Sequence, residues 1–335
     1  MGLQIGELIS RKEITFEELK GKVVAVDAYN AIYQFLSSVR QPDGTPLMDS
    51  KRRITSHLSG LFYRNVALLS EGIKLVYVFD GEYNVLKNRT HEIRQEAKIV
   101  SADKYEKAKE EEDVEGMGKY ARGFVKLEKW MVEESKALLE AMGIAVVQAP
   151  GEGEMQAAHL VKTGEAYAVA SQDYDALVVG GKKLIQNLTL ARKRKTVSGY
   201  VEIRPEVIEY EKVLNELGID ADRFICLAIL VGTDFNPGGI RGIGPKKALA
   251  LVKQRKYPVE IFREVEHQLE FNWQDVFEIF KKPNVHDFKV IFPKLNEDRV
   301  ISILVGEHDF SEERVVKNLD KLHQLKRQSA QQKLF

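Results

Sequence analysis

The chain has 335 residues, of which 44% are hydrophobic and 30% charged, so it can bury a substantial core and is not intrinsically disordered. Its single cysteine, Cys226, lies in an apolar run and excludes both a disulfide framework and a cysteine zinc cluster. No stretch approaches the roughly 20 apolar residues of a membrane span, and the first residues lack the pattern of a signal peptide. The composition therefore predicts a soluble, intracellular protein.

Short apolar runs and helical patterns alternate along the chain. The runs are rich in Val and Ile, as is typical of buried strands in a mostly parallel sheet. The alternation predicts a doubly wound α/β fold with helices on both faces of the sheet. The predicted strands occupy residues 23–26, 75–79, 144–147, 166–170 and 177–179, and the predicted helices residues 32–39, 54–70, 124–142 and 155–162.

One segment interrupts this alternation after the second predicted strand. Residues 87–136 contain 12 basic and 12 acidic side chains, many strong helix formers and only scattered apolar positions. Such helices cannot belong to the core, so an exposed helical hairpin is predicted. Because the segment starts at the end of a strand, we expect it to stand over whatever site the sheet carries.

Acidic residues follow four of the predicted strands, and another follows the apolar helix that ends near Val231. In open α/β sheets, ligands bind outside the carboxyl ends of the strands. A single acid at this position is usually a turn or helix-cap residue, but several together indicate a site. These acids are Asp27, Asp80, Glu152, Glu154, Asp173, Asp175 and Asp234.

Seven anions at one edge of a sheet repel one another, so they require protons or divalent cations. Hard oxygen ligands favour Mg²⁺ or Mn²⁺. Two such ions about 3.5 to 4 Å apart can activate a water and stabilise the leaving oxygen of a phosphodiester. The seven histidines are scattered without metal-ligand spacing, and neither a phosphate-binding loop nor a nucleophile elbow is present. The sequence therefore predicts metal-dependent phosphoryl chemistry.

A glycine turn followed by lysines forms a second candidate site. Gly242 and Gly244 permit a sharp turn, Pro245 begins a helix, and Lys246 and Lys247 add positive charge. From residue 182 to 256 there are 15 basic against 8 acidic residues. We expect this region to hold the backbone of a DNA duplex without reading its sequence. Another dense group of basic residues in it is Arg192, Lys193, Arg194 and Lys195.

These features, in this order, resemble the flap endonucleases, structure-specific 5′ nucleases of the archaeal and eukaryotic type with a PIN-like fold. The resemblance extends from residue 1 to about residue 310. The family normally has Tyr where Phe235 stands. The segments that carry the resemblance are residues 26–28, 32–36, 78–81, 149–158, 171–175 and 232–240.

The resemblance implies that the seven acids hold two Mg²⁺ ions, directly or through water, with Mn²⁺ as a substitute. Lys87 and Arg94 match a basic pair that steadies the scissile phosphate, although from the sequence alone they could be surface charges. Tyr33 matches an aromatic residue that stacks on a base, whereas its pattern alone fits a helix core. Arg40 is placed near the bend in the DNA. Residues 87–132 resemble a helical arch through which a 5′ single strand passes.

The resemblance also implies a domain organisation and partners. Residues 1–326 are expected to form one monomeric nuclease domain. Its glycine turn corresponds to a helix-hairpin-helix-type element at 232–251 that binds K⁺ in the family. The tail at 327–335 contains only the beginning of a sliding-clamp (PCNA) motif before it ends at Phe335. The expected parts of the domain are 1–86, the arch at 87–132, 133–258 and 259–326.

The expected function is cleavage of DNA where a 5′ flap meets a duplex, with 5′-3′ exonuclease activity, in Okazaki fragment processing and repair. It would operate with the DNA, in the cytoplasm or nucleoid of an archaeon or the nucleus of a eukaryote. A small-molecule phosphatase of the covalent type needs Asp-x-Asp, but Ala28 and Tyr29 follow Asp27. A non-catalytic DNA-binding scaffold has no use for seven acids. A related 5′ exonuclease or bubble-cutting repair nuclease shares the same core, and the short arch and tail favour the flap enzyme.

Overall fold

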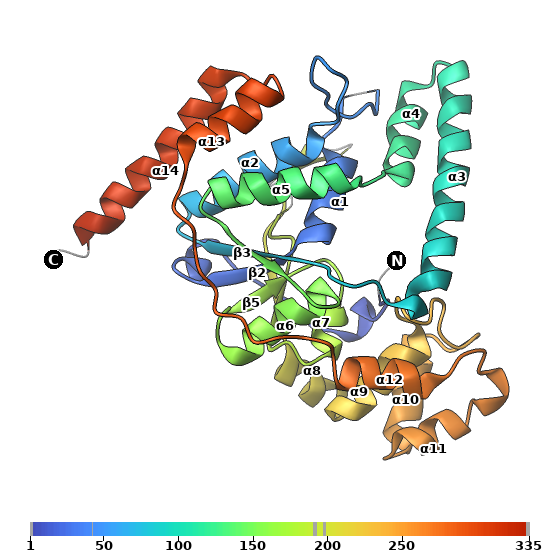
Figure 1. Ribbon diagram of the computed structural model, residues 1–335. Helices are drawn as coiled ribbons and strands as arrows, with labels where there is room; N and C mark the ends of the chain where they lie inside the picture. The colour runs from blue at the N-terminus through green and yellow to red at the C-terminus, as the bar shows by residue number, and fades with distance from the viewer. Residues whose placement is uncertain (1–2, 42, 190–192, 197–198, 333–335) are drawn as a thin grey trace.

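Seven strands form one mixed sheet at the centre of the molecule (Figure 1). The computed structural model of the chain describes residues 3–41, 43–189, 193–196 and 199–332. The order of the strands is β1-β9-β6-β5-β2-β3-β4; β6, β5, β2, β3 and β4 are parallel, and β9 is antiparallel to both β6 and β1. This confirms the predicted mostly parallel sheet. The strands are β1 (Lys12–Glu13), β2 (Val23–Asp27), β3 (Lys74–Phe79), β4 (Ala145–Gln148), β5 (Ala168–Ala170), β6 (Lys183–Gln186) and β9 (Glu206–Glu209).

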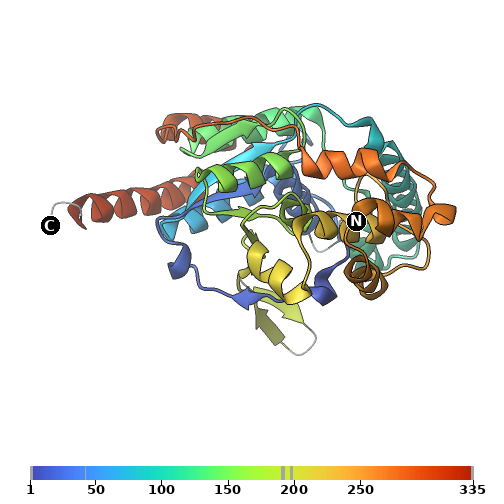
Figure 2. The same cartoon turned by 90° about the horizontal axis from the view of Figure 1, so that it is seen from below.

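Helices cover both faces of this sheet, as predicted (Figures 1 and 2). On one face lie α1 (Ala28–Ser38), α2 (Ser56–Ser70) and α5 (Lys129–Ala141), with α13 (Glu297–Ile301) and α14 (Glu312–Gln332) packed against them. On the other face lie α6 (Gly153–Thr163), α7 (Asp175–Val178), α8 (Tyr210–Leu217) and α9 (Ala221–Val231). Around α9 lie α10 (Pro245–Gln254), α11 (Pro258–Arg263) and α12 (Trp273–Lys281).

The central strands are buried on both faces, which explains their continuous apolar sequences. Along β3, Leu75, Tyr77 and Phe79 pack toward α1 and α2, while Val76 and Val78 pack toward α6. This alternation follows from the two-residue period of a strand. The one polar atom of this group, the Tyr77 hydroxyl, donates a hydrogen bond to Asn65 Oδ1 at 2.9 Å.

One predicted strand is wrong. Residues 177–179 belong to the short helix α7 and its cap, and the next strand, β6, begins only at Lys183. A run of three buried apolar residues has too little length to distinguish a strand from a helix. The chain turns at Gly180, where φ is +78°, and enters the sheet after that turn.

The charged segment forms two helices, α3 (Asn88–Glu110) and α4 (Val114–Tyr120), which stand beside the sheet in Figure 1. Within α3 only Thr90 and Ala108 are buried, in agreement with the predicted exposed hairpin. The ring of Tyr105 in α3 meets the ring of Phe124, which follows α4, edge to face at 5.3 Å between centroids and so joins the two arms of the hairpin. Aromatic contacts of this kind contribute about 1 kcal/mol.

The chain between α12 and α13 runs along the outside of the molecule (Figure 2). Gln156 of α6 holds this segment through two hydrogen bonds with the backbone of His286, at 2.8 and 2.9 Å. This segment leads to α13 and α14, and α14 packs against α2 on the opposite face of the sheet. None of the helices in the described residues is both long and apolar enough to cross a bilayer.

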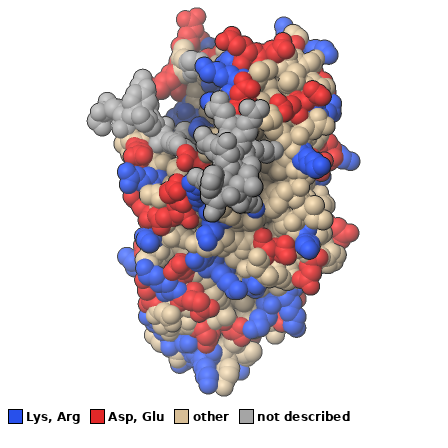
Figure 3. Space-filling model, turned by 90° about the vertical axis from the view of Figure 1, so that its left-hand side faces the viewer, with Lys and Arg blue, Asp and Glu red and all other residues tan. Residues whose placement is uncertain are grey.

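The side of the molecule opposite the arch carries Lys and Arg interspersed with Asp and Glu (Figure 3). Mixed signs of charge are typical of a solvated surface rather than of a phosphate-binding face. This face therefore carries both signs of charge, in keeping with the formal net charge of zero.

A buried polar cluster joins the C-terminal helices to the rest of the fold. His308 places Nδ1 3.1 Å from Asp49 Oδ2 and Nε2 3.1 Å from Glu134 Oε1. Arg53 also contacts Asp49, at 2.8 Å, and His57 Nε2 lies 3.7 Å from Glu134 Oε2. Both nitrogens of His308 face carboxylates, which requires the doubly protonated imidazolium. Burial lowers the pKa of His308, but its hydrogen bonds with Glu134 and Asp49 outweigh burial and raise it.

We predict that His308→Gln lowers the free energy of unfolding by about 2 kcal/mol at pH 6. Because the pKa of His308 is higher in the folded state than in the unfolded state, where it is about 6.5, its protonation stabilises the fold fully below the unfolded pKa. This stabilisation is lost as the pH rises through the folded-state pKa. The difference between the two proteins should therefore shrink from pH 6 to pH 9 in urea unfolding. His159→Gln, at a histidine paired with the exposed Asp287, is the control. An equal difference at both pH values would show that His308 is not held in its charged form.

Candidate active site

The seven predicted acids all lie at the carboxyl edge of the parallel strands. Asp27 ends β2, and Asp80 follows β3 directly. Asp175 begins α7, just after β5, and Asp234 lies in the turn that follows α9. The other three occupy the loops after β4 and β5: Glu152 at the N-cap of α6, Glu154 in its first turn, and Asp173 between β5 and α7.

Backbone N–H groups at helix starts hold two of these carboxylates. Asp27 Oδ1 accepts from the N–H of Asn30 in the first turn of α1 at 3.0 Å, and Asp80 Oδ1 accepts from Gly153 at the start of α6 at 2.7 Å. The positive end of a helix dipole stabilises an anion there. Gly153 is required by this approach, because a Cβ at that position would lie 2.8 Å from Asp80 Oδ1.

The acids influence one another's ionisation, which shows that they form one electrostatic cluster. Burial raises the pKa of Asp175 to about 8, with further contributions from Asp234 and Asp173. Burial and then the charge of Asp80 raise the pKa of Asp27 to about 7. The pKa values of three further acids are raised in the same way, by burial and then by neighbouring carboxylates; these are Asp80, Glu154 and Asp173.

Two cations at the base of the arch point into this cluster. Lys87 Nζ pairs with Glu152 Oε2 and lies 4.0 Å from Asp234 Oδ2, and Arg94 Nη2 donates to both oxygens of Asp234, at 2.8 and 2.7 Å. Thr90, which the sequence analysis missed, donates from Oγ1 to the Asp234 carbonyl at 2.7 Å. The spacing of 87, 90 and 94 places all three on one face of the arch base, a signal the sequence does contain.

Comparison with known proteins identifies the family. Residues 3–100 match the family model of the XPG N-terminal domain, and residues 143–234 match the XPG I-region. Flap endonuclease 1 of Pyrococcus abyssi is 51% identical over 325 residues, 96% of this chain and 94% of that protein; that of Thermococcus onnurineus is 50% identical over the same shares. The solved flap endonuclease-1 from Methanococcus jannaschii has a TM-score of 0.76 at 41% identity, covering 97% of this chain and 98% of that one. The chain belongs to the flap endonuclease family.

Membership of the flap endonuclease family establishes the class of reaction. The chain is a nuclease that cleaves flapped DNA, a hydrolase of phosphodiester bonds, and roles in replication and repair fit its relatives. Nucleases of this family depend on metal ions. The resemblance found in the sequence is therefore confirmed.

The two other residues that the flap endonuclease resemblance singled out lie on and just after α1. Tyr33 is 39% exposed, so it is not part of a helix core, and Lys98 Nζ of the arch lies 5.7 Å from its ring centroid. Arg40 is partly buried and donates to the carbonyls of Leu36 at 2.9 Å and Gly44 at 2.6 Å. These contacts give Arg40 a structural role in the loop after α1.

The glycine turn of the flap endonuclease fold lies between α9 and α10. Gly242 has φ +77°, and Gly244 is the N-cap of α10, which Pro245 begins. Lys247 Nζ donates to the Gly242 carbonyl at 3.0 Å, and Lys246 is 81% exposed on its side chain, 3.5 Å from Glu7. A Cβ at either glycine would meet no atom within 4 Å, so the turn is open to a ligand.

The remaining basic group lies in the region of a small hairpin formed by β7 (Lys193–Thr196) and β8 (Gly199–Glu202). The backbones of Lys193, Arg194 and Lys195 form β7. Arg192 lies outside the described residues.

We predict that Asp175→Asn stabilises the protein in the presence of a chelator. Because the folded-state pKa of about 8 exceeds the unfolded value, the charged carboxylate destabilises the fold above pH 8, and this effect fades as pH falls toward 4. Urea unfolding at pH 8.5 should give an increase of about 2 kcal/mol that declines toward pH 5. Asp222→Asn, which removes an exposed partner of Lys281, should give no such gain. A loss of stability at pH 8.5 would contradict the prediction.

Proposed function

We propose that this protein cleaves DNA near the junction of a 5′ flap and a duplex by two-metal-ion hydrolysis. The observation that carries the proposal is the convergence of seven acids from separate strands and helices at one sheet edge, beneath the base of a helical arch. The raised pKa values of Asp27, Asp80, Glu154, Asp173 and Asp175 indicate a concentration of negative charge that divalent cations would neutralise. A 5′-3′ exonuclease activity would use the same site.

The donor set fits Mg²⁺, with Mn²⁺ as a substitute, because every candidate ligand atom is a carboxylate oxygen. Asp175 Oδ1 is buried and has no hydrogen-bond partner, as expected for an atom reserved for a ligand. In the described part of the chain, no three acidic or histidine side chains are already placed to share one ion. Mg²⁺ usually keeps several waters and binds through one or two carboxylates, so these acids would hold the ions partly through water. Bound divalent ions would acidify a water and stabilise the leaving oxygen.

The cations of the arch base would act on the substrate. Lys87 and Arg94 stand where the scissile phosphate would meet the carboxylates, and we infer that they hold its oxygens and stabilise the charge of the transition state. Tyr33, exposed beside the arch, is suited to stack against an unpaired base. Arg40, which follows α1 and makes its two backbone contacts through Nε and Nη1, would contact the bent DNA in addition to holding the loop after α1.

The turn between α9 and α10 would bind the duplex through its backbone. Its exposed glycine N–H groups at Gly242 and Gly244, with Lys246 and Lys247, suit a phosphate, and K⁺ would bind at the same turn as in the family. The basic strand β7 would add further phosphate contacts. Recognition would depend on shape rather than on base sequence, because these contacts read no base edges.

We further propose that the chain acts as a monomer, inside the cell and in contact with DNA. A contact with the sliding clamp would use the tail that ends at Phe335, which lies outside the described residues.

We predict that Asp80→Asn lowers the cleavage rate on an end-labelled flap substrate by at least about 100-fold in Mg²⁺, because one ligand oxygen is lost. Binding of the flap measured in Ca²⁺ should change by less than about threefold. Nicked and hairpin DNA, each with and without Mg²⁺, define the substrate preference.

The matched control is Asp287→Asn, the same change at an exposed carboxylate outside the cluster, which should cut as the parent does. If Asp80→Asn retained full cleavage, or if the parent protein cut equally well with a chelator, two-metal hydrolysis at this site would be rejected.

We predict that replacing Lys246 and Lys247 together by Ala weakens duplex binding and reduces the slope of log K against log salt by about 2, since each phosphate contact releases about one counterion. Fluorescence anisotropy at several salt concentrations measures this slope. Replacing Lys20 and Lys74, at the opposite end of the sheet, removes the same charge and should leave the slope unchanged. Equal slopes for the parent and both variants would show that the turn does not contact the DNA backbone.

A further inference from the structure

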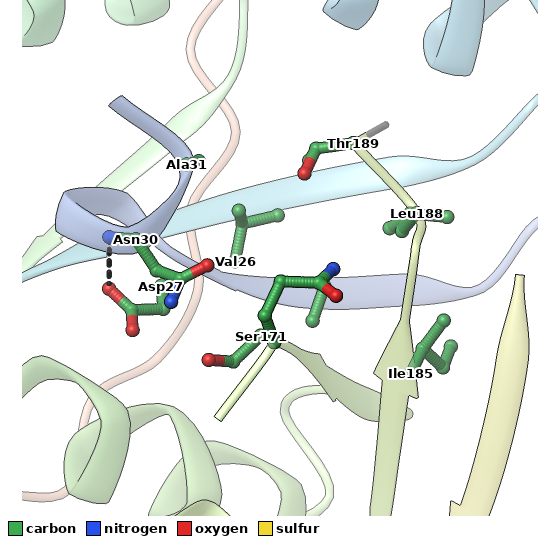
Figure 4. Close-up of a pocket in the computed structure, with 10 residues that line it drawn as sticks. Val26, Asp27, Asn30, Ala31, Ser171, Ile185, Leu188 and Thr189 are labelled. Atoms are coloured by element: carbon green, nitrogen blue, oxygen red, sulfur yellow. Dashed lines mark hydrogen bonds between the residues drawn. The ribbon is translucent and has the colours of Figure 1, made fainter. Parts of the chain in front are cut away.

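Asn30 connects two of the acids, Asp27 at the end of β2 and Asp173 in the loop after β5. Its backbone N–H donates to Asp27 Oδ1 at 3.0 Å, the contact drawn in Figure 4, and its side-chain Nδ2 donates to Asp173 Oδ2 at 3.1 Å. Strands β2 and β5, which end near these two acids, are paired in parallel, with Val26 opposite Ala170. One residue of α1 therefore spans the two central strands at the site.

The two hydrogen bonds have different requirements. Any residue except proline at position 30 could donate the backbone bond, because it is the ordinary capping contact of α1 with its N-cap, Asp27. The bond to Asp173 needs a side chain of this length with an N–H donor. A capping role alone therefore does not explain why an amide occupies position 30.

The surroundings of Asn30 restrict its side chain. It lies beside a narrow hollow between α1 and strands β2, β5 and β6, where Val26, Ile185 and Leu188 supply apolar walls (Figure 4). One turn further along α1, Gln34 exchanges hydrogen bonds with Thr189, donating to its carbonyl at 3.1 Å and accepting from its hydroxyl at 3.0 Å. These bonds connect α1 to the loop after β6 one turn beyond Asn30, and neither of them involves an acid.

We propose that Asn30 is a positioning residue that sets the separation of the Asp27 and Asp173 carboxylates and so prepares the metal site. The inference rests on the proposed function, in which these two acids hold metal. A neutral amide suits the task, because it orients a carboxylate without neutralising the charge that must attract a cation. A lysine here would compete with the metal, and an aspartate would add repulsion. Donors of this kind, behind the ligands of a metal, affect its affinity by about 10- to 100-fold.

The test compares Asn30→Ala and Asn30→Leu in the full chain. Both remove the donor to Asp173 and keep the backbone bond to Asp27, and Leu preserves the size of the side chain. Calorimetric titration with Mn²⁺ in the absence of DNA should show affinity weakened by about 10- to 100-fold in both variants. The Mn²⁺ concentration for half-maximal flap cleavage should rise by the same factor, while KM for DNA at saturating Mn²⁺ changes by less than about threefold.

Gln34→Leu is the matched control, because it removes a side-chain amide one turn along the same helix whose partner is Thr189 rather than an acid. It should bind Mn²⁺ as the parent does. Equal Mn²⁺ affinity in the parent and both Asn30 variants would overturn the inference, and so would a defect in Ala that Leu repairs, which would indicate packing alone. If the parent itself bound no Mn²⁺ and cut no flap, the proposed function would fail instead.

Discussion

The repulsion among seven clustered carboxylates, all of them buried or half-buried, is the constraint on which the rest of this structure depends. Burial makes each charge more costly, and neighbouring carboxylates add to that cost, as the raised pKa values of Asp27 and Asp175 show. The fold opposes this repulsion with fixed donors: helix N–H groups contact Asp27 and Asp80, and the arch supplies Lys87 and Arg94. A cluster of acids that attracts divalent ions therefore lowers the stability of the fold, and interactions elsewhere in the fold must compensate for that loss.

Asp234 shows how this support joins separate parts of the chain. It belongs to the turn that leads from α9 to the glycine element, yet Arg94 and Thr90 of the arch both bind to it. Lys87 Nζ also lies 5.1 Å from the ring centroid of Phe235, the next residue. The proposed duplex-binding turn and the arch therefore meet at a metal-binding candidate. Movement of either element would therefore shift Asp234 directly, because Asp234 and its neighbour Phe235 contact the arch.

The acids could be predicted from the sequence because each follows a short apolar run, and the edge of a parallel sheet brings such positions together. The helix α7 could not be predicted, because a short apolar run such as Leu177 and Val178 fits a buried strand as well as a buried helix. Asn30 and Thr90 were missed because their partners, Asp173 and Asp234, lie more than 100 residues away. The contacts of these two side chains can be identified only in the folded structure, which brings the distant partners together.

Stability for such a site comes from outside it. The two apolar cores, one on each face of the sheet, hold the strands whose ends carry the acids. Near the start of α2 and in the first half of α5, the His308 cluster pairs the two cations Arg53 and His308 with the two carboxylates Asp49 and Glu134, so its negative charges are balanced, unlike those of the active site. Both clusters are buried ionic groups, and they differ in where their positive charge originates. The His308 cluster carries its own cations and therefore fixes structure, whereas the acids at the strand ends have too few and therefore favour a ligand.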